Sequence, residues 1–421
     1  MKKTFYFIII FILVVILAFT IYSFFTYDNK QGISSIGTSL QQFFPFGTEV
    51  TTPSTPTTTQ TRPDEPELTP LEIPILRHIT LTPIGGATLI NSPKSTTTIR
   101  YIDRGTGHIY ETAIDASANT KITNATIPKI QETVWINDNT VIARFLDTDN
   151  ETIRSFLGVI GSLPKNKTSS EDTGIIPLRT FTGSFLPTNI PQIVVSPNKT
   201  SYFNLSTSAD GTIGLVTSLK TNAKTQIFVS PLREWLAQWT QDSIIVLTMK
   251  ASAFENGYAY TINPTTGVQK KIVDGKKGLT TLASPSTPLT IAYSESKDRG
   301  VLFSVFDPKI NKQTSISKPT LSEKCVWETS TSLVCAIPKE IPSAIYPDAW
   351  YQGTASFTDD LMRINASTGT TSLIADLTKL PGGQEIDVIN LILSDKKDYL
   401  LFTNKKDLTL WGIDLKRAQA I

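Results

Sequence analysis

The chain has 421 residues, of which 39 are lysine or arginine and 37 are aspartate or glutamate, so its formal charge at pH 7 is only +2. This balance lacks the clustered positive charge of a nucleic-acid-binding protein, and we expect no nucleic-acid partner. The 23 glycines and 25 prolines of this threonine-rich chain favour turns and strands over long helices.

The N-terminal segment predicts a membrane anchor. Lys2 and Lys3 precede an uncharged run from Phe5 to Phe25, and the first acidic residue is Asp28. About 20 apolar residues cross the hydrocarbon core as a helix, and lysines on the short leading side favour a cytoplasmic N-terminus. A cleaved signal peptide is the alternative, but the run is longer than the usual ~7–15 residues and no small-x-small cleavage site follows it. We expect residues 1–28 to form a cytoplasmic tip and a single-pass signal anchor, with the rest of the chain outside the cytoplasm.

Residues 29–74 predict a disordered stalk. Positions 51–63 read TTPSTPTTTQTRP, and an acidic DEPE follows them. Prolines favour extended polyproline conformations and the polar residues favour solvent, so this segment cannot bury a core. We expect the stalk to hold the following domain, residues 75–421, away from the membrane.

Beyond the stalk, short apolar runs separated by turn signals form units that look alike. The sequence IDRGTG at 102–107 recurs as INPTTG at 262–267 and as INASTG at 364–369. Each copy predicts a strand that enters a tight turn, which needs a polar residue at its start and a glycine where φ becomes positive. The repeat length of roughly 40–50 residues is in the range of four-stranded propeller blades.

Seven units are predicted from these repeats, and the last one supplies only three strands, at 388–393, 399–404 and 408–415. The segment at 76–82 has strand character and no partner of its own. We expect it to complete the last blade, because closing the ring removes two exposed sheet edges. The predicted fold is therefore all-β: a seven-bladed β-propeller closed by an N-terminal strand, with six or eight blades as the alternatives. The units begin near Gly86, Glu132, Gln192, Glu234, Leu279, Lys324 and Val388.

These turns carry a family resemblance. The Asp/Asn-x-x-Thr-Gly turns and the Ser-Pro-Asn-Lys turn at 196–199 resemble those of WD40-like and TolB-like bacterial β-propeller repeats, over roughly residues 76–415. The sequence YPDAWYQG at 346–353 resembles a feature of uncharacterised membrane-anchored bacterial propeller proteins. The resemblance implies the architecture, but propellers of similar build serve as scaffolds, hydrolases and sugar-binding proteins, so the fold does not decide the function.

The only two cysteines, Cys325 and Cys335, are spaced as in a hairpin. If residues 326–327 pair with 333–334 around a turn, the thiols face each other on neighbouring strands, where a disulfide finds the Cα separation of about 4.4–6.8 Å that it needs. An oxidising compartment would permit this disulfide, and two buried free thiols are the alternative. No further cysteine or nearby histidine completes a metal site, and we expect neither a metal nor a cofactor.

A long insertion, roughly residues 338–358, sets the sixth unit apart. Exposed aromatic side chains in such a loop would grip a partner. The alternative is that the rings fold back and cap their own blade, since Trp and Tyr bury readily when their polar ends find partners. In propellers this connection lies on the face that carries the mouth of the central channel. The candidate binding-loop residues are Tyr346, Asp348, Trp350, Tyr351 and Phe357.

No nucleophile elbow, phosphate-binding glycine loop or His-Glu-x-x-His helix occurs, and we predict no catalytic residue. The preferred hypothesis is a non-catalytic module of the cell envelope that is anchored through residues 5–25 and binds an envelope protein or a surface polymer. The alternative is a carbohydrate-active envelope hydrolase or lyase that uses carboxylates at the channel mouth. A third hypothesis, an accessory subunit of a secretion or pilus assembly, cannot be separated from the first by sequence.

Overall fold

A computed structural model of the chain describes residues 73–90, 97–115, 118–147, 149, 151–163 and 178–419. The predicted anchor at residues 5–25 and nearly all of the predicted stalk lie outside these ranges. Within them, no helix combines the length and the apolar character that a membrane span requires. The described residues belong to a compact unit that spans Leu71–Ile421.

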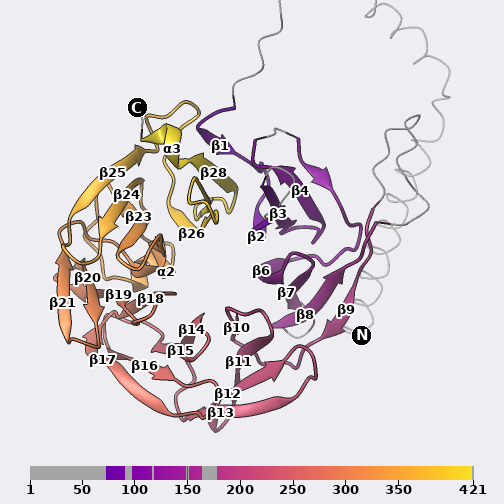
Figure 1. Cartoon of the computed structure of the whole chain (residues 1–421), viewed down its shortest axis with the longest axis horizontal. Helices are drawn as coiled ribbons and strands as arrows, with labels where there is room; N and C mark the ends of the chain where they lie inside the picture. Colours follow the sequence, from indigo (N-terminus) through magenta and orange to yellow (C-terminus); the bar gives the residue numbers. More distant parts are fainter. Residues whose placement is uncertain are drawn as a thin grey trace, which may run out of the picture. The chain divides into compact units, whose positions relative to one another are not determined.

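In this unit the described strands form seven four-stranded antiparallel sheets arranged around a common centre, as Figure 1 shows. Blades 1 to 6 are each built from four consecutive strands. The strands of blades 1 to 3 are β2 (Ile84–Ile90), β3 (Thr98–Asp103), β4 (Ile109–Ala113), β5 (Thr120–Lys121), β6 (Ile130–Asn137), β7 (Thr140–Asp147), β8 (Thr152–Ile160), β9 (Phe181–Phe185), β10 (Gln192–Val195), β11 (Ser201–Ser208), β12 (Gly211–Ser218) and β13 (Lys224–Ser230).

The next three blades repeat the pattern, with the first strand of each nearest the centre of the ring (Figure 1). Their strands are β14 (Trp235–Gln241), β15 (Ile244–Met249), β16 (Asn256–Ile262), β17 (Gln269–Lys277), β18 (Thr280–Ala283), β19 (Ile291–Lys297), β20 (Gly300–Asp307), β21 (Lys312–Ile316), β22 (Cys325–Trp327), β23 (Ser332–Pro338), β24 (Asp359–Asn365) and β25 (Thr371–Asp376). Three short helices accompany the described strands: η1 (Ser322–Lys324), α2 (Asp348–Tyr351) and α3 (Leu415–Ala418).

Blade 7 joins the two ends of the described chain. It contains β26 (Val388–Leu393), β27 (Tyr399–Asn404), β28 (Leu410–Asp414) and, as its outermost strand, β1 (Leu76–His78). In the β1–β28 pairing Leu76 lies opposite Ile413 and His78 opposite Trp411, with the two rings of the latter pair stacked 4.1 Å apart. The predicted closure of the ring by an N-terminal strand is therefore confirmed.

The predicted seven units are also confirmed, and each predicted start lies within two residues of the first strand of a blade. The repeated turns have the expected geometry. Asn263 Oδ1 accepts hydrogen bonds from the backbone N–H groups of Thr265 and Thr266, both at 2.9 Å, and Gly267 has a φ of 71°. Asn365 and Gly369 repeat this arrangement in blade 6, with a φ of 76° at the glycine.

The core lies between neighbouring blades. One cluster of buried side chains joins blade 7 to blade 1 through Leu401, Leu410 and Ile99, and another joins blade 3 to blade 4 through Phe203 and Leu247. Burying one such side chain stabilises the fold by about 1.5–3 kcal/mol. The stability of each blade thus depends on packing against its neighbours, and this packing fixes the positions of the innermost strands.

Candidate functional site

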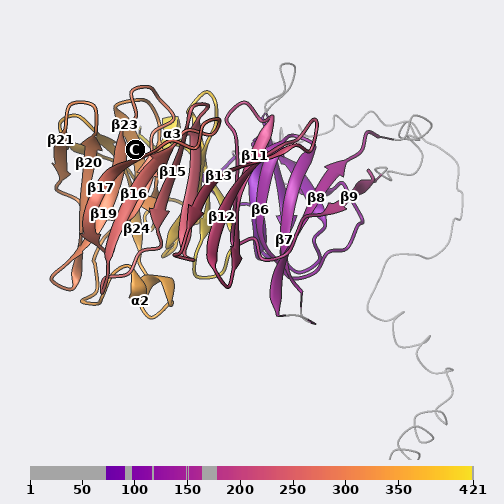
Figure 2. The same cartoon turned by 90° about the horizontal axis from the view of Figure 1, so that it is seen from below.

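The insertion of blade 6 lies on one face of the propeller. It connects β23 to β24 and contains α2, which Figure 1 places toward the middle of the ring and Figure 2 at one face of the domain. Residues just before β22 and β26 reach the same place, because their side chains contact the insertion. The insertion therefore lies at one end of the space between the innermost strands, where Trp350 lines a cavity; we call this place the channel mouth.

Three rings of the candidate binding loop are buried, so a partner cannot grip them as exposed groups. The exposed fractions of Tyr346, Trp350 and Phe357 are 0%, 4% and 2%. The Phe357 ring stacks on those of Tyr346 and Trp350 at centroid distances of 5.6 and 6.4 Å. The Tyr346 hydroxyl donates to the Pro342 carbonyl at 2.7 Å. Of the two interpretations of this loop, the structure shows the second: the rings are buried and their polar ends find partners. The rings pack not only on their own blade but also against Val301 of blade 5 and Ile389 of blade 7.

The other two residues of that loop are half-buried and fasten α2 to its surroundings. Asp348 Oδ2 accepts a hydrogen bond from the backbone N–H of Ala253, in blade 4, at 2.8 Å. The Tyr351 hydroxyl donates to Glu323 Oε1 at 2.6 Å. Burial, together with the nearby Glu323 carboxylate, raises the pKa of Tyr351, so this phenol stays a hydrogen-bond donor at neutral pH.

Beneath the insertion lies a fully buried ionic cluster of Lys324, Asp359 and Asp387. The Lys324 Nζ atom is 2.5 Å from Asp387 Oδ1 and 2.8 Å from Asp359 Oδ2, and all three side chains are 0% exposed. Burial raises the pKa of Asp359 to about 6, although the Lys324 ammonium opposes the shift. A buried lysine needs such partners, because an unpaired charge in the interior is strongly destabilising.

Asp387 connects this cluster to the insertion. Its Oδ2 atom accepts hydrogen bonds from Trp350 Nε1 at 3.1 Å, Ser356 Oγ at 3.2 Å and the Phe357 backbone N–H at 3.0 Å. The Lys324 Nζ atom lies 5.4 and 5.2 Å from the ring centroids of Trp350 and Phe357. The Asp387 carboxylate thus holds the insertion of blade 6 against the start of blade 7.

The channel mouth next to Trp350 contains a cavity of about 500 Å³. Six blades contribute to its lining, through the first strands of blades 2 to 5 and 7, the residues before β22, and the insertion. The lining is mixed: the carboxylates of Glu132 and Glu323, three amides and several aliphatic side chains. The amide and aliphatic groups belong to Gln192, Gln238, Asn390, Leu236, Leu282 and Ile389.

Glu132 and Glu323 are the only charged side chains that line this cavity in the described part of the chain. The side chain of Glu132 is 53% exposed and pairs with Arg144 at 2.9 Å. Glu323 is half-buried yet closely surrounded by protein atoms, and this burial raises its pKa, against the effects of the Tyr351 hydrogen bond and of Lys324. Lys405 does not line the cavity, but its Nζ atom lies 5.0 Å from the centroid of the Trp350 ring.

No family model matches the chain. No curated protein matches it either. Solved structures similar to it include a puromycin-hydrolyzing peptidase of Mycobacterium tuberculosis, with a TM-score of 0.46 and 11% identity over 75% of this chain and 50% of that one. TolB from Acinetobacter baumannii has a TM-score of 0.40 and 12% identity, over 68% of this chain and 62% of that one. The β-propeller domain of the Trilobed protease from Pyrococcus furiosus has a TM-score of 0.47 and 9% identity, over 79% of this chain and 97% of that one.

The chain thus spans only half to about three fifths of the peptidase and TolB chains. At these identities the likeness concerns the fold alone. The predicted resemblance to TolB-like propeller repeats is confirmed at the level of the fold, since the described strands form seven four-stranded sheets around a common centre.

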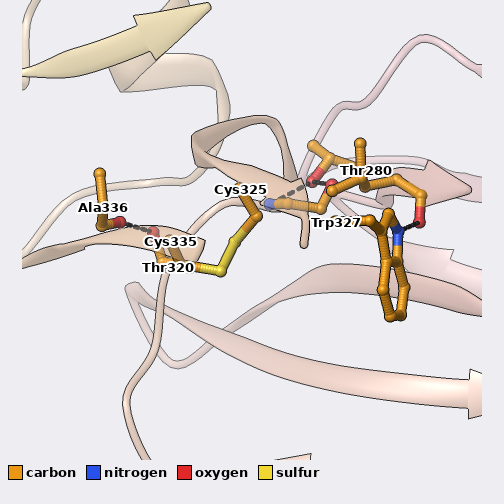
Figure 3. The surroundings of a disulfide bond; sticks show 8 residues. Thr280, Thr320, Cys325, Trp327, Cys335 and Ala336 are labelled. Carbon is orange, nitrogen blue, oxygen red and sulfur yellow. Dashed lines mark hydrogen bonds between the residues drawn. A yellow bond between two sulfur atoms is a disulfide. The ribbon is translucent and has the colours of Figure 1, made fainter. Parts of the chain in front are cut away.

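The two cysteines lie on the inner hairpin of blade 6, beside the cluster. Cys325 and Cys335 are directly opposite in the β22–β23 pairing and form a disulfide, which Figure 3 shows among its neighbours. Thr320 Oγ1 donates to the Ala336 carbonyl at 2.7 Å, and Trp327 Nε1 donates to the Leu282 carbonyl at 3.3 Å. Because the two cysteines are joined in this disulfide, neither offers a free thiol for chemistry.

The sequence did not identify the charged residues of this site. Lys324 and Glu132 served only as markers of unit starts, and neither Asp359 nor Asp387 was among the candidate binding residues. One signal was available: Lys324 and Asp387 each directly precede an apolar innermost strand, where a charged residue enters the crowded centre of the ring. Among the described residues, no group of three or more His, Cys, Asp or Glu side chains could hold a metal ion.

Proposed function

We propose that the protein is a non-catalytic binding module of the cell envelope, which holds a segment of a partner in the mouth of its channel. The observation that carries this proposal is the cavity of about 500 Å³, lined by six blades. Its volume is within the range of about 300–1,000 Å³ that is usual for ligand sites. The site differs from the loop first expected, because Trp350 contributes to it from a buried position rather than as an exposed ring.

The lining favours a partner that offers hydrogen-bond donors. The two carboxylates accept only, and bonds to charged acceptors are stronger than those between neutral groups. Leu236, Leu282 and Ile389 provide apolar surface beside them. A protein segment with a lysine or arginine side chain and an aliphatic neighbour fits this combination best, and a hydroxyl-rich surface polymer is the second class.

The proposed location is the outer side of a membrane, with residues 5–25 as the single-pass anchor and the N-terminus in the cytoplasm. The apolar run after Lys2 and Lys3 supports it, and so does the disulfide, which persists in oxidising compartments. Protease added to intact cells, or to spheroplasts where the envelope has two membranes, should digest the propeller. A propeller that is cleaved only after the membrane is dissolved would contradict this location.

A photo-crosslinking residue at the channel mouth tests the binding role. Gln192 lines the cavity from blade 3, whereas Leu373 is 57% exposed on the outermost strand of blade 6 and serves as the matched control. In host cells, crosslinks from position 192 of the full-length protein should capture one envelope partner that position 373 does not. The same captured set from both positions would contradict a channel-mouth site.

The alternative is a carbohydrate-active hydrolase or lyase. The observation in its favour is that Glu132 is open to solvent beside Arg144, while Glu323 has a raised pKa, as a general acid requires. Glycans of the host surface should be incubated with the wild-type protein and with the Glu323→Gln variant. Cleavage by the wild type alone would replace the binding proposal with this one.

A further inference from the structure

The binding proposal leaves the buried Lys324–Asp359–Asp387 cluster without a role in ligand capture. An amine and two carboxyl groups, all 0% exposed, meet there beside the rings of Trp350 and Phe357. The Nζ to Oδ1 distance of 2.5 Å between Lys324 and Asp387 brings a nucleophile against a carboxyl carbon. This arrangement can do chemistry as well as hold charge.

We propose that Lys324 and Asp387 condense into an intramolecular amide bond, with Asp359 as the catalytic proton carrier. The bond would be an isopeptide crosslink between the residue that precedes β22 and the residue that precedes β26. These two residues are 63 positions apart in the sequence. The crosslink would therefore enclose blade 6, including its insertion, in a covalent loop.

The reaction begins with a proton transfer. One proton of the Lys324 ammonium passes to Asp359, whose Oδ2 atom is 2.8 Å away and whose pKa burial raises to about 6. The Nζ atom is then an uncharged nucleophile. The rings of Trp350 and Phe357 keep water from hydrating it again.

Asp387 is the electrophile because its second oxygen already has donors around it. Trp350 Nε1, Ser356 Oγ and the Phe357 N–H all reach Oδ2 within 3.0–3.2 Å. Fixed donors of this kind stabilise the negative charge that develops on a carboxyl oxygen when a nucleophile adds to its carbon. Oδ1, which lies next to Nζ, is then the oxygen that leaves.

Asp359 is placed to move the protons. Its Oδ2 atom lies 2.8 Å from Lys324 Nζ and accepts the Val388 N–H at 2.7 Å. Its Oδ1 atom is buried and has no hydrogen-bond partner among the described residues. A pKa of about 6, raised by burial, suits a group that takes up and releases a proton near neutral pH.

The step balances without any other reactant. The Nζ–Cγ bond forms and the Cγ–Oδ1 bond breaks. Two protons of the Lys324 ammonium leave with Oδ1 as one water molecule, carried by Asp359, which ends in its starting state. The ammonium and one carboxylate become a neutral amide, so two buried charges disappear from a site where each is unfavourable.

Peptide mapping of the wild-type, full-length protein tests the proposal without depending on a variant. After reduction and trypsin digestion, an amide at Lys324 blocks cleavage there. The expected product is a branched peptide in which residues 313–339 are joined to residues 380–396, lighter than the sum of the two peptides by one water. Separate peptides, with cleavage after Lys324, would overturn the proposal.

Two near-isosteric variants test the roles of the carboxyl groups. In Asp359→Asn the proton carrier is lost, and we expect separate peptides; a joined peptide would overturn the role of Asp359.

In Asp387→Asn the same amide forms with loss of ammonia instead of water, so the joined peptide should have the wild-type mass. Separate peptides from this variant would contradict Asp387 as the electrophile.

Discussion

Blades 6 and 2 both carry aromatic residues outside their innermost strands, and the two blades place them in opposite environments. In blade 6, Tyr346, Trp350 and Phe357 are buried, and hydrogen bonds to Pro342 and Asp387 satisfy their polar ends. In blade 2, Phe185 ends the outermost strand β9 and is 55% exposed, with the Arg154 guanidinium 4.3 Å from its ring. The difference shows that partners from other segments, rather than the local sequence, decide whether a ring is buried.

Removing the carboxylate that anchors the insertion should have the largest effect. We expect Asp387→Ala to lower the free energy of unfolding by about 3–5 kcal/mol, because it removes one of the two carboxyl groups around the buried Lys324 and the hydrogen-bond acceptor of Trp350 Nε1. Urea unfolding of the full-length protein in detergent measures it. Asp360→Ala is the matched control: its partly exposed pair with Lys339 should be worth no more than about 1 kcal/mol. Equal losses would contradict an anchor role for Asp387.

Deleting one ring from each blade compares the two environments directly. Trp350→Ala should lower the free energy of unfolding by roughly 3 kcal/mol, since it opens a cavity among buried rings. Phe185→Ala removes a ring that is already half exposed to solvent. We expect the loss of its contacts with Phe156 and Arg154 to lower the free energy of unfolding by about 1 kcal/mol or less. Thermal unfolding of both variants beside the wild type gives the comparison. A larger loss at Phe185 would reverse it.

The disulfide should stabilise blade 6 by less than the buried cluster does. The Cys325→Ser, Cys335→Ser double variant frees a loop with a sequence separation of 10. Closing so short a loop contributes about 2–3 kcal/mol by the chain-entropy argument. The denaturation midpoint with and without reductant measures the same quantity in the wild type. An unchanged midpoint on reduction would show that the bond adds nothing to this hairpin.

The smallest expected effect concerns the half-buried ion pairs of the two blades. In blade 6, burial alone would raise the pKa of Glu328, but hydrogen bonds from Arg363 and Ser332 outweigh it and hold this pKa below its ordinary value. The carboxylate therefore contributes stability above its unfolded-state pKa, and this stability is lost as pH falls through the lower folded-state value.

Glu328→Gln should accordingly flatten the acid side of the stability profile, by about 1 kcal/mol or less. Asp147→Asn in blade 2, where the pair with Arg154 spans 3.6 Å, is the control and should change the profile less. Unfolding midpoints measured from pH 7 down to the acid limit of folding would show the difference. A profile unchanged in Glu328→Gln would contradict the stabilising role of its pair with Arg363.

The sequence predicted the features that local chemistry determines. The turns of the Asn263 and Asn365 type, the three strands of blade 7 and the closing strand all follow from patterns within a few residues. The channel-mouth residues did not follow, because their partners are far apart in the chain: Lys324 meets Asp387 63 residues later, and Trp350 meets it after 37. Such contacts depend on how blades 6 and 7 pack against each other, which no pattern within a few residues records.

The most direct test of the channel-mouth account is the affinity of its captured partner for the full-length protein and for the Glu323→Gln variant. Losing a hydrogen bond to a charged group costs about 1.5–3 kcal/mol, so we expect the affinity to fall by roughly tenfold or more. Glu234→Gln is the control, since this exposed carboxylate pairs with Lys250 and does not line the cavity. The account predicts weaker binding for Glu323→Gln alone; unchanged affinity, or an equal loss in both variants, would contradict it.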